Sequence, residues 1–159
     1  MKILGIESSC DETSVAIVED GRKILSNVVA SSSLFHQKYG GIVPEVAARK
    51  QIEFMIPVLE EAIKQYYLLN NQKKSQSHPC TNEDLDSRFR GNDIKKEIDA
   101  IAVTVGPGLI GSLLVGVETA KTLSFAWNKP IIPVNHVLAH IYAVFLKEKN
   151  YELRTMNYK

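Results

Sequence analysis

Two histidines with helical spacing are the clearest candidates for chemistry in this sequence. His136 and His140 are four residues apart, so on a helix both imidazoles would lie on one face, one turn apart. This is the usual arrangement of a pair of histidine metal ligands. Val137 stands where a metalloprotease helix carries its catalytic glutamate, so that motif is absent. The spacing alone leaves a second interpretation open, in which one histidine caps the helix and the other is half-buried.

A polar loop near the N-terminus is the second candidate. It runs from Glu7 to Thr13, and its candidate groups are two serines, a cysteine and two carboxylates: Ser8, Ser9, Cys10, Asp11 and Glu12. Hydroxyl and backbone N–H groups in such a turn can bind an oxyanion, and Asp11 and Glu12 can orient a substrate, bind magnesium or act as acid and base. The alternative is an ordinary polar turn whose side chains bond to their own backbone. Cys10 fits a small buried thiol better than a nucleophile.

Two further loops have the composition of binding loops. Gly106 and Gly108 flank a proline between an apolar strand and a helix, where glycines permit close backbone approach and the helix N-terminus favours an anion. Plain turn chemistry explains this pattern equally well. The other segment runs from His36 to Arg49. Glu45 and Arg49 form an ordinary i,i+4 pair on a helix surface, so the spacing favours a structural loop there.

Hydrophobic periodicity predicts the elements that position these groups. Three neighbouring strands with short turns predict an antiparallel meander, and the alternating elements after them predict a mixed sheet with helices on both faces. Pro57 predicts either a kink in the first long helix or the start of a second one. The predicted strands span residues 2–7, 14–18, 23–30, 100–105 and 130–134, and the predicted helices span 44–66, 109–127 and 136–147.

The segment 70–97 differs from the rest of the chain in composition. Between Lys73 and Glu97 there are eleven charged residues and three large apolar ones. Such a segment cannot bury enough apolar surface to offset the entropy of ordering it. We therefore predict an insertion that loops out of the fold.

The overall composition limits the class of protein. The chain has 159 residues, a net charge of +1, a mean hydropathy of −0.09 and two cysteines. This length suits one domain rather than two full-size ones, and the charge argues neither for nor against a nucleic-acid partner. Two cysteines are too few for a disulfide framework, and no apolar run approaches the ~18 residues of a membrane span. We expect a cytoplasmic protein with no membrane association.

Four motifs taken together resemble a known family. They lie at residues 3–13, 36–49, 106–109 and 134–140. In this order they resemble the universal tRNA adenosine threonylcarbamoyltransferases, formerly described as O-sialoglycoprotein endopeptidases. The resemblance covers residues 1 to about 69 and 98 to about 150. The element order also resembles the ribonuclease-H-like half of an actin-like, sugar-kinase ATPase fold.

The resemblance implies a reaction and its site. A threonylcarbamoyl group would pass from threonylcarbamoyl-adenylate to N6 of adenosine 37 in tRNAs that read codons starting with A. His136 and His140 would bind one divalent metal, iron in preference to zinc, and Asp11 and Glu12 would be catalytic. The implied partners are tRNA, the adenylate-forming enzyme, a sister subunit of the same fold and a small ATPase. Candidates for substrate or phosphate binding are Ser8, Ser9, His36, Glu45, Gly106 and Gly108.

The chain departs from the family pattern in several places. Leu138 and Ala139 replace a glutamate and a glycine, and Gln51 stands where a histidine is usual. The resemblance implies an N-terminal domain at 1–150, interrupted by the insertion at 70–97, and a non-family tail at 151–159. The second domain, with the adenylate pocket and the third metal ligand, would be absent, so we expect a truncated form that is inactive by itself.

The same sequence features allow a second function. The chain can be a non-catalytic remnant or a partner-binding module of the same fold. The sister subunit of this family lacks the histidine pair, so His136 and His140 argue against that particular assignment.

Overall fold

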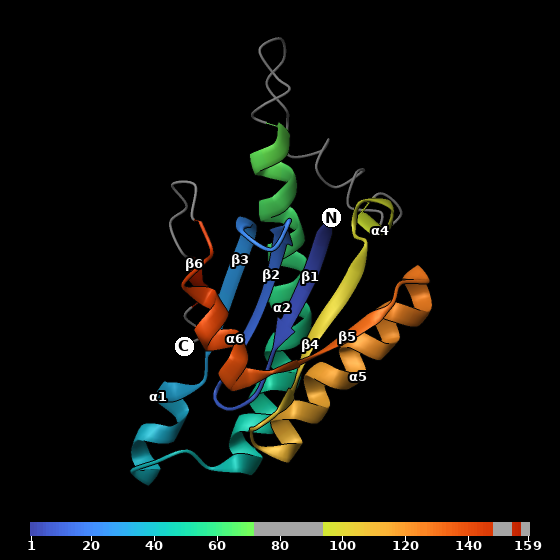
Figure 1. Ribbon diagram of the computed structural model, residues 1–159. Coiled ribbons are helices and arrows are strands. Elements are labelled where there is room, and N and C mark those ends of the chain that lie inside the picture. The colour runs from blue at the N-terminus through green and yellow to red at the C-terminus, as the bar shows by residue number, and fades with distance from the viewer. Residues whose placement is uncertain (72–93, 148–153, 157–159) are drawn as a thin grey trace.

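One mixed sheet forms the centre of the computed structural model, which describes residues 1–71, 94–147 and 154–156 (Figure 1). In the described part, the strands lie in the order β5-β4-β1-β2-β3-β6. β2 is antiparallel to β1 and β3, whereas β4 is parallel to both β1 and β5. β6 pairs in parallel with β3. The strands are β1 (Lys2–Glu7), β2 (Glu12–Glu19), β3 (Lys23–Ser31), β4 (Ala100–Gly106), β5 (Ile131–Asn135) and β6 (Arg154–Met156).

The order of β1 to β5 confirms the predicted ribonuclease-H-like sheet. The first three strands form a meander, and the next two strands extend it on the β1 side. Asp20 and Gly21 connect β2 to β3 with φ angles of 54° and 64°, which is the left-handed backbone that a tight hairpin requires. The parallel alignment of β1, β4 and β5 brings their carboxyl ends to the same edge of the sheet.

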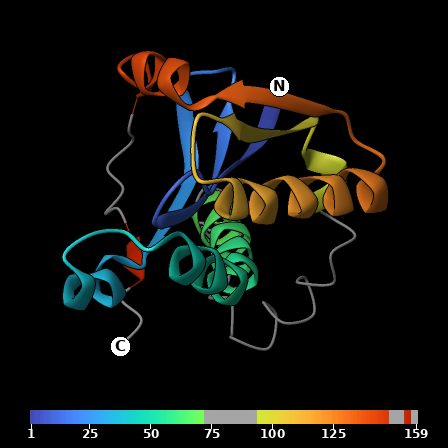
Figure 2. The same cartoon turned by 90° about the horizontal axis from the view of Figure 1, so that it is seen from below.

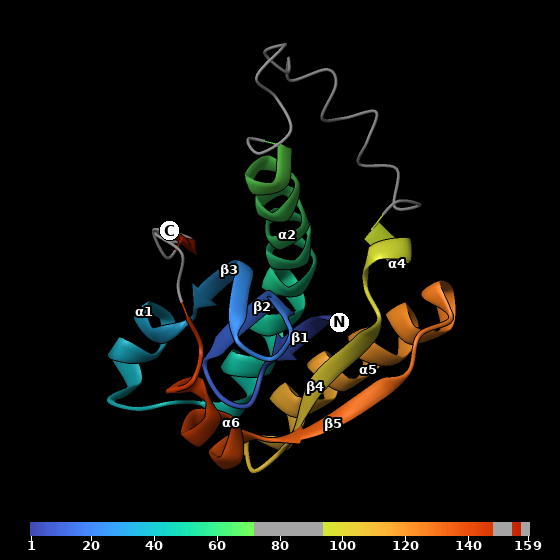
Figure 3. The ribbon, with the colours of Figure 1, turned by 45° about the horizontal axis from the view of Figure 1, so that its top comes forward.

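Helices cover the sheet unequally on its two faces. The long helices α2 (Pro44–Asn71) and α5 (Ile110–Trp127) pack side by side on one face, and α6 (His136–Ala143) lies on the other (Figure 2). Figure 3 shows α6 directly after β5, beyond the end of that strand. The short helices α1 (Ser33–His36) and α4 (Ile94–Glu97) and the 3-10 turn Gln37–Tyr39 complete the described helical elements. The predicted helices on both faces are therefore present.

The core lies between the sheet and the α2–α5 layer. α2 continues through Pro57, so the prediction of a second helix starting there is wrong. Phe54, Met55 and Val58 around the proline are almost fully buried, and this packing outweighs the backbone hydrogen bond that proline removes. The buried apolar side chains of the sheet include Leu4, Ile6, Val15, Ile17, Val28, Ile101 and Val103.

The predicted insertion was placed too broadly. α2 extends through Asn71, and Ile94 at the start of α4 is 2% exposed within the core, so both ends of the 70–97 segment belong to the fold. The sequence alone does not show whether an apolar residue beside a polar segment, such as Ile94, packs into the core. The remainder, residues 72–93, lies outside the described residues. The last predicted helix is also shorter than expected and ends at Ala143.

A polar cluster fastens α4 to the start of β1. Lys2 Nζ lies 2.6 Å from the Tyr66 hydroxyl and 2.9 Å from Glu97 Oε2, and the Tyr66 hydroxyl donates to the same carboxylate. Burial lowers the pKa of Lys2, but these hydrogen bonds outweigh it and raise that pKa above its ordinary value. The cluster therefore joins β1, α2 and α4 by charge-assisted bonds.

Close packing joins α5 to the loop that follows β1. Ser8 Oγ donates to the Ser112 carbonyl at 2.9 Å and accepts from the Gly116 N–H at 3.2 Å. A Cβ at residue 116 would overlap Ser8 Oγ, whereas a Cβ at Gly111 would meet only the Ala48 Cβ, at 3.2 Å. Gly116 therefore permits the approach of α5 that the rest of the site depends on.

We predict opposite effects for alanine at the two glycines of α5. Gly116→Ala should lower the free energy of unfolding by about 1–3 kcal/mol through overpacking. Gly111→Ala should be neutral or stabilising, because alanine favours a helix over glycine by ~1 kcal/mol. Urea denaturation of both variants measures the difference, and adding Ser8→Ala to Gly116→Ala should recover part of the loss. Equal stability of the two single variants would contradict the close packing.

We also predict that residues 72–93 are dispensable for stability, whereas Ile94 is not. Its composition indicates that replacing residues 72–93 with a short linker leaves stability nearly unchanged, since loop-closure entropy varies slowly with length. Ile94→Ala should cost about 2–5 kcal/mol, the usual cost of removing a buried isoleucine side chain. Chemical denaturation of both variants tests this. A comparable loss from the linker replacement would show that residues 72–93 contribute to the core.

Candidate functional site

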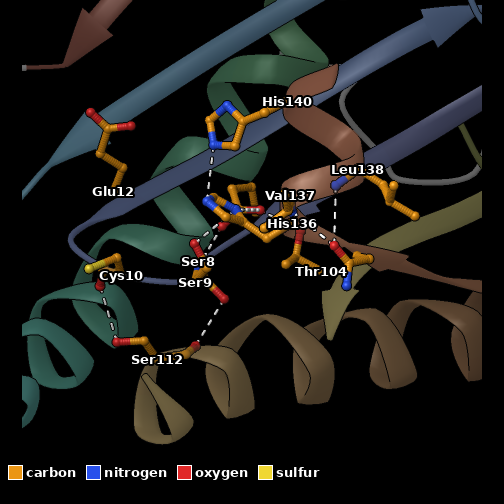
Figure 4. Close-up of polar contacts among 12 residues, drawn as sticks. Ser8, Ser9, Cys10, Glu12, Thr104, Ser112, His136, Val137, Leu138 and His140 are labelled. Carbon is orange, nitrogen blue, oxygen red and sulfur yellow. Dashed lines mark hydrogen bonds and ion pairs between the residues drawn. The ribbon is translucent and has the colours of Figure 1, made fainter. Parts of the chain in front are cut away.

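α6 begins at His136 because the side chain of Asn135 caps it. Asn135 Oδ1 accepts hydrogen bonds from the backbone N–H groups of Val137, at 3.0 Å, and Leu138, at 3.2 Å. Figure 4 shows the imidazoles of His136 and His140 turned toward one another. Their ring centroids are 4.4 Å apart, and their Nε2 atoms are 3.0 Å apart. The predicted helical spacing therefore does bring the two rings together.

Glu7, the first residue of the candidate loop, to which the sequence assigned no role, lies beside the ring of His136. His136 Nδ1 is 3.3 Å from Glu7 Oε2 and 3.2 Å from Ser9 Oγ. The Thr104 hydroxyl donates to the same carboxylate oxygen, and the Ser9 N–H donates to Glu7 Oε1 at 2.6 Å. Residues from the carboxyl ends of β1 and β4 and from the start of α6 therefore meet at one point.

Glu7 is held in its ionised form. Burial raises the pKa of Glu7, but hydrogen bonds from Ser9, Thr104 and His136 outweigh it, so the pKa lies below its ordinary value. The sequence did not single out Glu7 and Thr104 because their contact depends on the register of two parallel strands 97 residues apart. A polar residue at the end of each strand was the only available signal.

The loop between β1 and β2 is fixed through its carbonyl groups. Gln51 Nε2, from the buried face of α2, lies 3.2 Å from the Ser8 carbonyl, 2.9 Å from that of Cys10 and 3.2 Å from that of Glu12. Ser112 Oγ donates to the Cys10 carbonyl at 3.2 Å. The amide of Gln51, a departure from the family pattern, thus reaches three backbone carbonyl groups of the loop.

The second glycine loop packs directly on this first loop. The Leu109 N–H donates to the Ser9 carbonyl at 2.7 Å, and a Cβ at Gly108 would lie 2.5 Å from that same oxygen. Gly106 has a φ of 149°, a backbone conformation that residues with side chains rarely adopt. Ser9, Gly106 and Gly108 therefore lie in one region of the fold. The hydroxyl of Ser8 is engaged by α5 instead.

The two candidate catalytic carboxylates differ in exposure: Asp11 is half-buried and Glu12 is exposed. The Asp11 carbonyl accepts from the N–H and hydroxyl of Ser32, at 2.9 and 2.8 Å, while Glu12 opens β2 and is exposed. Burial and the neighbouring charges of Asp11 and Glu12 raise the pKa of the Cys10 thiol. A thiol with a raised pKa stays protonated at neutral pH, which argues against a nucleophile, although Cys10 is half-buried rather than buried as expected.

Two candidates make their contacts elsewhere. His36 is buried, with Nε2 3.1 Å from Ser32 Oγ and Nδ1 accepting from the Val43 N–H at 3.3 Å. Both of its ring nitrogens are thus used in holding the connection between α1 and α2. Glu45 lies in the first turn of α2 and pairs with Arg49 at 2.7 Å on an exposed surface. The described contacts do not bring either side chain to the histidine pair.

The histidine pair fits two neighbouring positions of a metal ion. With metal–nitrogen bonds of about 2.1 Å, two nitrogens 3.0 Å apart subtend an angle of about 90°. Among the residues that the structure describes, no group of three or more His, Cys, Asp or Glu side chains is placed to hold a metal. Within that part of the chain, the histidine pair could supply at most two ligands.

A cavity opens beside the histidines. It has a volume of about 370 Å³ and lies between α6 and the sheet face opposite α2 and α5. Its walls are mostly small and apolar, with Glu7, Thr104 and the histidines at one end. The lining includes Gly5, Ala16, Ala102, Ala139 and Ala143. Such a volume is at the lower end of the ~300–1,000 Å³ of small-molecule sites.

None of the described helices has the length and apolar character needed to cross a membrane.

Relatives from several bacteria match nearly the whole chain. Three of them share the name tRNA N6-adenosine threonylcarbamoyltransferase. Those of Treponema denticola and Thermomicrobium roseum are each 49% identical, and that of Staphylococcus saprophyticus is 44% identical. Each match covers 92% of this chain but 36%, 33% and 35% of the respective relative. The chain thus spans about a third of the length of the curated relatives it matches.

Solved structures give a weaker likeness. YeaZ from Pseudomonas aeruginosa is 17% identical, with a TM-score of 0.44 over 85% of this chain and 45% of that one. A second structure, described as an uncharacterized protein with similarity to peptidase YEAZ from the same organism, is 18% identical with a TM-score of 0.47. It covers 84% of this chain and 43% of that one.

A family model matches most of the chain in two segments. The model is TsaD, tRNA N6-adenosine threonylcarbamoyltransferase, and the segments are residues 23–72 and 85–154. The second segment includes Gly106, Gly108 and both histidines, and reaches four residues into the predicted tail. Together with the identities above, this match shows that the chain belongs to the tRNA N6-adenosine threonylcarbamoyltransferase family.

Proposed function

We propose that this chain forms the N-terminal, metal-binding part of an enzyme that transfers a threonylcarbamoyl group to tRNA. The donor is threonylcarbamoyl-adenylate and the acceptor is N6 of adenosine 37 in tRNAs reading codons that start with A. The observation that carries the proposal is the facing pair of Nε2 atoms, 3.0 Å apart, in a chain of this family. Because the chain spans about a third of its relatives, the complete reaction needs further parts that those relatives contain.

Different residues of the chain would bind the metal, position its ligands and accept the proton. His136 and His140 would hold one divalent metal, iron in preference to zinc, and a bound metal would supply Lewis-acid polarisation of the carbamoyl oxygen. Glu7 holds His136 in place from behind. Asp11, which is half-buried, or Glu12, which is exposed, would accept the proton that the attacking amine loses. The loop itself is held rigid by Gln51, so these carboxylates start from a fixed backbone.

The partners and location follow from the same proposal. The enzyme would act on tRNA in the cytoplasm, with an adenylate-forming enzyme supplying the donor and a small ATPase assisting. A sister subunit of the same fold would dock on the α2–α5 layer. An apolar groove between these helices, about 470 Å³ in volume, supports this docking. Its exposed apolar residues are Ile52, Ile56 and Leu114.

The same groove supports the second candidate function. A partner-binding module without turnover needs a surface of this kind and no complete catalytic site. Scattered apolar residues on a surface are normal, but a contiguous apolar groove between two helices is a common docking site. The two functions differ in whether the histidine pair binds a metal, which the first experiment measures.

We predict that the chain binds a divalent metal weakly through its histidine pair. Two imidazoles leave most coordination positions to water, so the affinity should be far below that of a complete site. Competition with a coloured chelator measures the affinity for Fe²⁺ and Zn²⁺. The double variant His136→Ala, His140→Ala should lose this binding, and Glu118→Gln on the exposed face of α5 should keep it. Equal affinities for wild type and double variant would remove the proposed site.

We also predict no detectable transfer by the 159-residue chain alone. Transfer requires donor and adenine to be held together, and a misplacement of about 1 Å can cost ~100-fold in rate. Mass spectrometry of nucleosides from digested tRNA, with the adenylate-forming enzyme, ATP, threonine and bicarbonate supplied, is the assay. The full-length Treponema denticola relative serves as the positive control. Turnover by the isolated chain would require a complete site within it or across two copies.

A further inference from the structure

We propose that Glu7 is a positioning residue that presets His136 as the Nδ1–H tautomer, so that its Nε2 is ready to bind a metal. His140, by contrast, must move its own proton from Nε2 to Nδ1 before it can bind. The two histidines of the pair are therefore unequal. This inference rests on the proposed metal site. It adds that His136 is ready to bind the metal and that His140 must first change its tautomer.

The first step of the argument is the partner of His136 Nδ1. That nitrogen faces Glu7 Oε2 at 3.3 Å and Ser9 Oγ at 3.2 Å. An ionised carboxylate can only accept hydrogen bonds. Nδ1 must therefore carry the proton, and the neutral ring leaves the lone pair on Nε2. Histidine ligands of metals commonly gain their orientation from a carboxylate in this way.

The second step is the rigidity of the carboxylate itself. Glu7 lies at the end of β1, and both of its oxygens have fixed donors. The Thr104 hydroxyl donates to Oε2, and the Ser9 N–H donates to Oε1 at 2.6 Å. The donors come from the neighbouring strand and from the loop that Gln51 immobilises. Glu7 thus cannot turn away without breaking these bonds, and the tautomer of His136 is fixed by the fold.

The third step concerns His140. Its Nε2 lies 3.0 Å from His136 Nε2, a distance at which two lone pairs would repel each other. His140 Nε2 therefore carries a proton and donates it to His136 Nε2. A metal needs both nitrogens unprotonated, so binding breaks this bond and moves the His140 proton to Nδ1. Because His140 is exposed, water can solvate the relocated proton.

Nuclear magnetic resonance reads the tautomers directly. Long-range ¹H–¹⁵N spectra of the metal-free 159-residue chain, recorded in mildly alkaline buffer, should show His136 as Nδ1–H and His140 as Nε2–H. Addition of Zn²⁺ should shift the proton of His140 alone. His36 is an internal reference, because Nδ1 accepts from Val43 and Nε2 faces Ser32, so it should stay Nε2–H throughout.

Substitution of Glu7 tests the cause. In Glu7→Gln the new amide can donate to Nδ1, so His136 should change to the Nε2–H tautomer and the affinity for Zn²⁺ should fall ~10–100-fold. Thr104→Val keeps the carboxylate but loses one donor that holds it, and should give a smaller loss in the same direction. Glu118→Gln removes the same charge from the exposed face of α5 and should change neither quantity.

The outcomes separate this inference from the proposed function. An unchanged tautomer of His136 in Glu7→Gln would overturn the positioning role, whatever the metal affinity. If wild type shows the expected tautomers but no Zn²⁺ binding, the positioning role is supported and the proposed metal site is contradicted. If Glu7→Gln fails to fold, Thr104→Val decides: an affinity and tautomer identical to wild type would overturn the inference.

Discussion

The close approach of α5 to the carboxyl end of β1 is the constraint on which the site depends. Gly108 and Gly116 leave room for the β1–β2 loop to lie against the β4–α5 connection, and Ser8 bonds to α5 from within that contact. A larger residue at either glycine would push the two loops apart. The pairing of β4 with β1 in turn places Thr104 beside Glu7. The two glycines thus allow the close packing of the loops next to the histidine pair.

The loop after β1 combines a fixed backbone with an exposed carboxylate, that of Glu12. Its carbonyl groups turn toward the α2–α5 layer, where Gln51, Ser112 and Leu109 donate to them. This leaves Glu12 exposed on the opposite side. Hydrogen bonds to its backbone carbonyl groups therefore fix the loop and leave the Glu12 carboxylate exposed. Such a division suits a site in which the carboxylates must meet a substrate, because their positions are set before it arrives.

The two cavities on opposite sides of the sheet differ in the groups that line them. The groove between α2 and α5 is apolar, whereas the face beneath α6 holds the Glu7–His136–His140 series at one end of its cavity. A partner docked on α2 and α5 would contact the same helices that hold Gln51 and Ser112. A partner docked in the groove would therefore act on the β1–β2 loop through α2 and α5, without touching the loop itself.

The sequence by itself determined the elements and the candidate loops. Alternation of apolar residues predicted the three-strand meander, the i,i+4 spacing predicted that His136 and His140 share a helix face, and four motifs in order predicted the family. It did not determine the ends of the 70–97 segment, since Ile94 looks from sequence like any apolar residue beside a polar stretch. It also did not reveal that Glu7 and Thr104 support His136, or that Gln51 holds the loop. These contacts join residues 39 to 129 positions apart. Only the register of parallel strands and the packing of α2 and α5 decide them, because no local pattern records which distant residues will face each other.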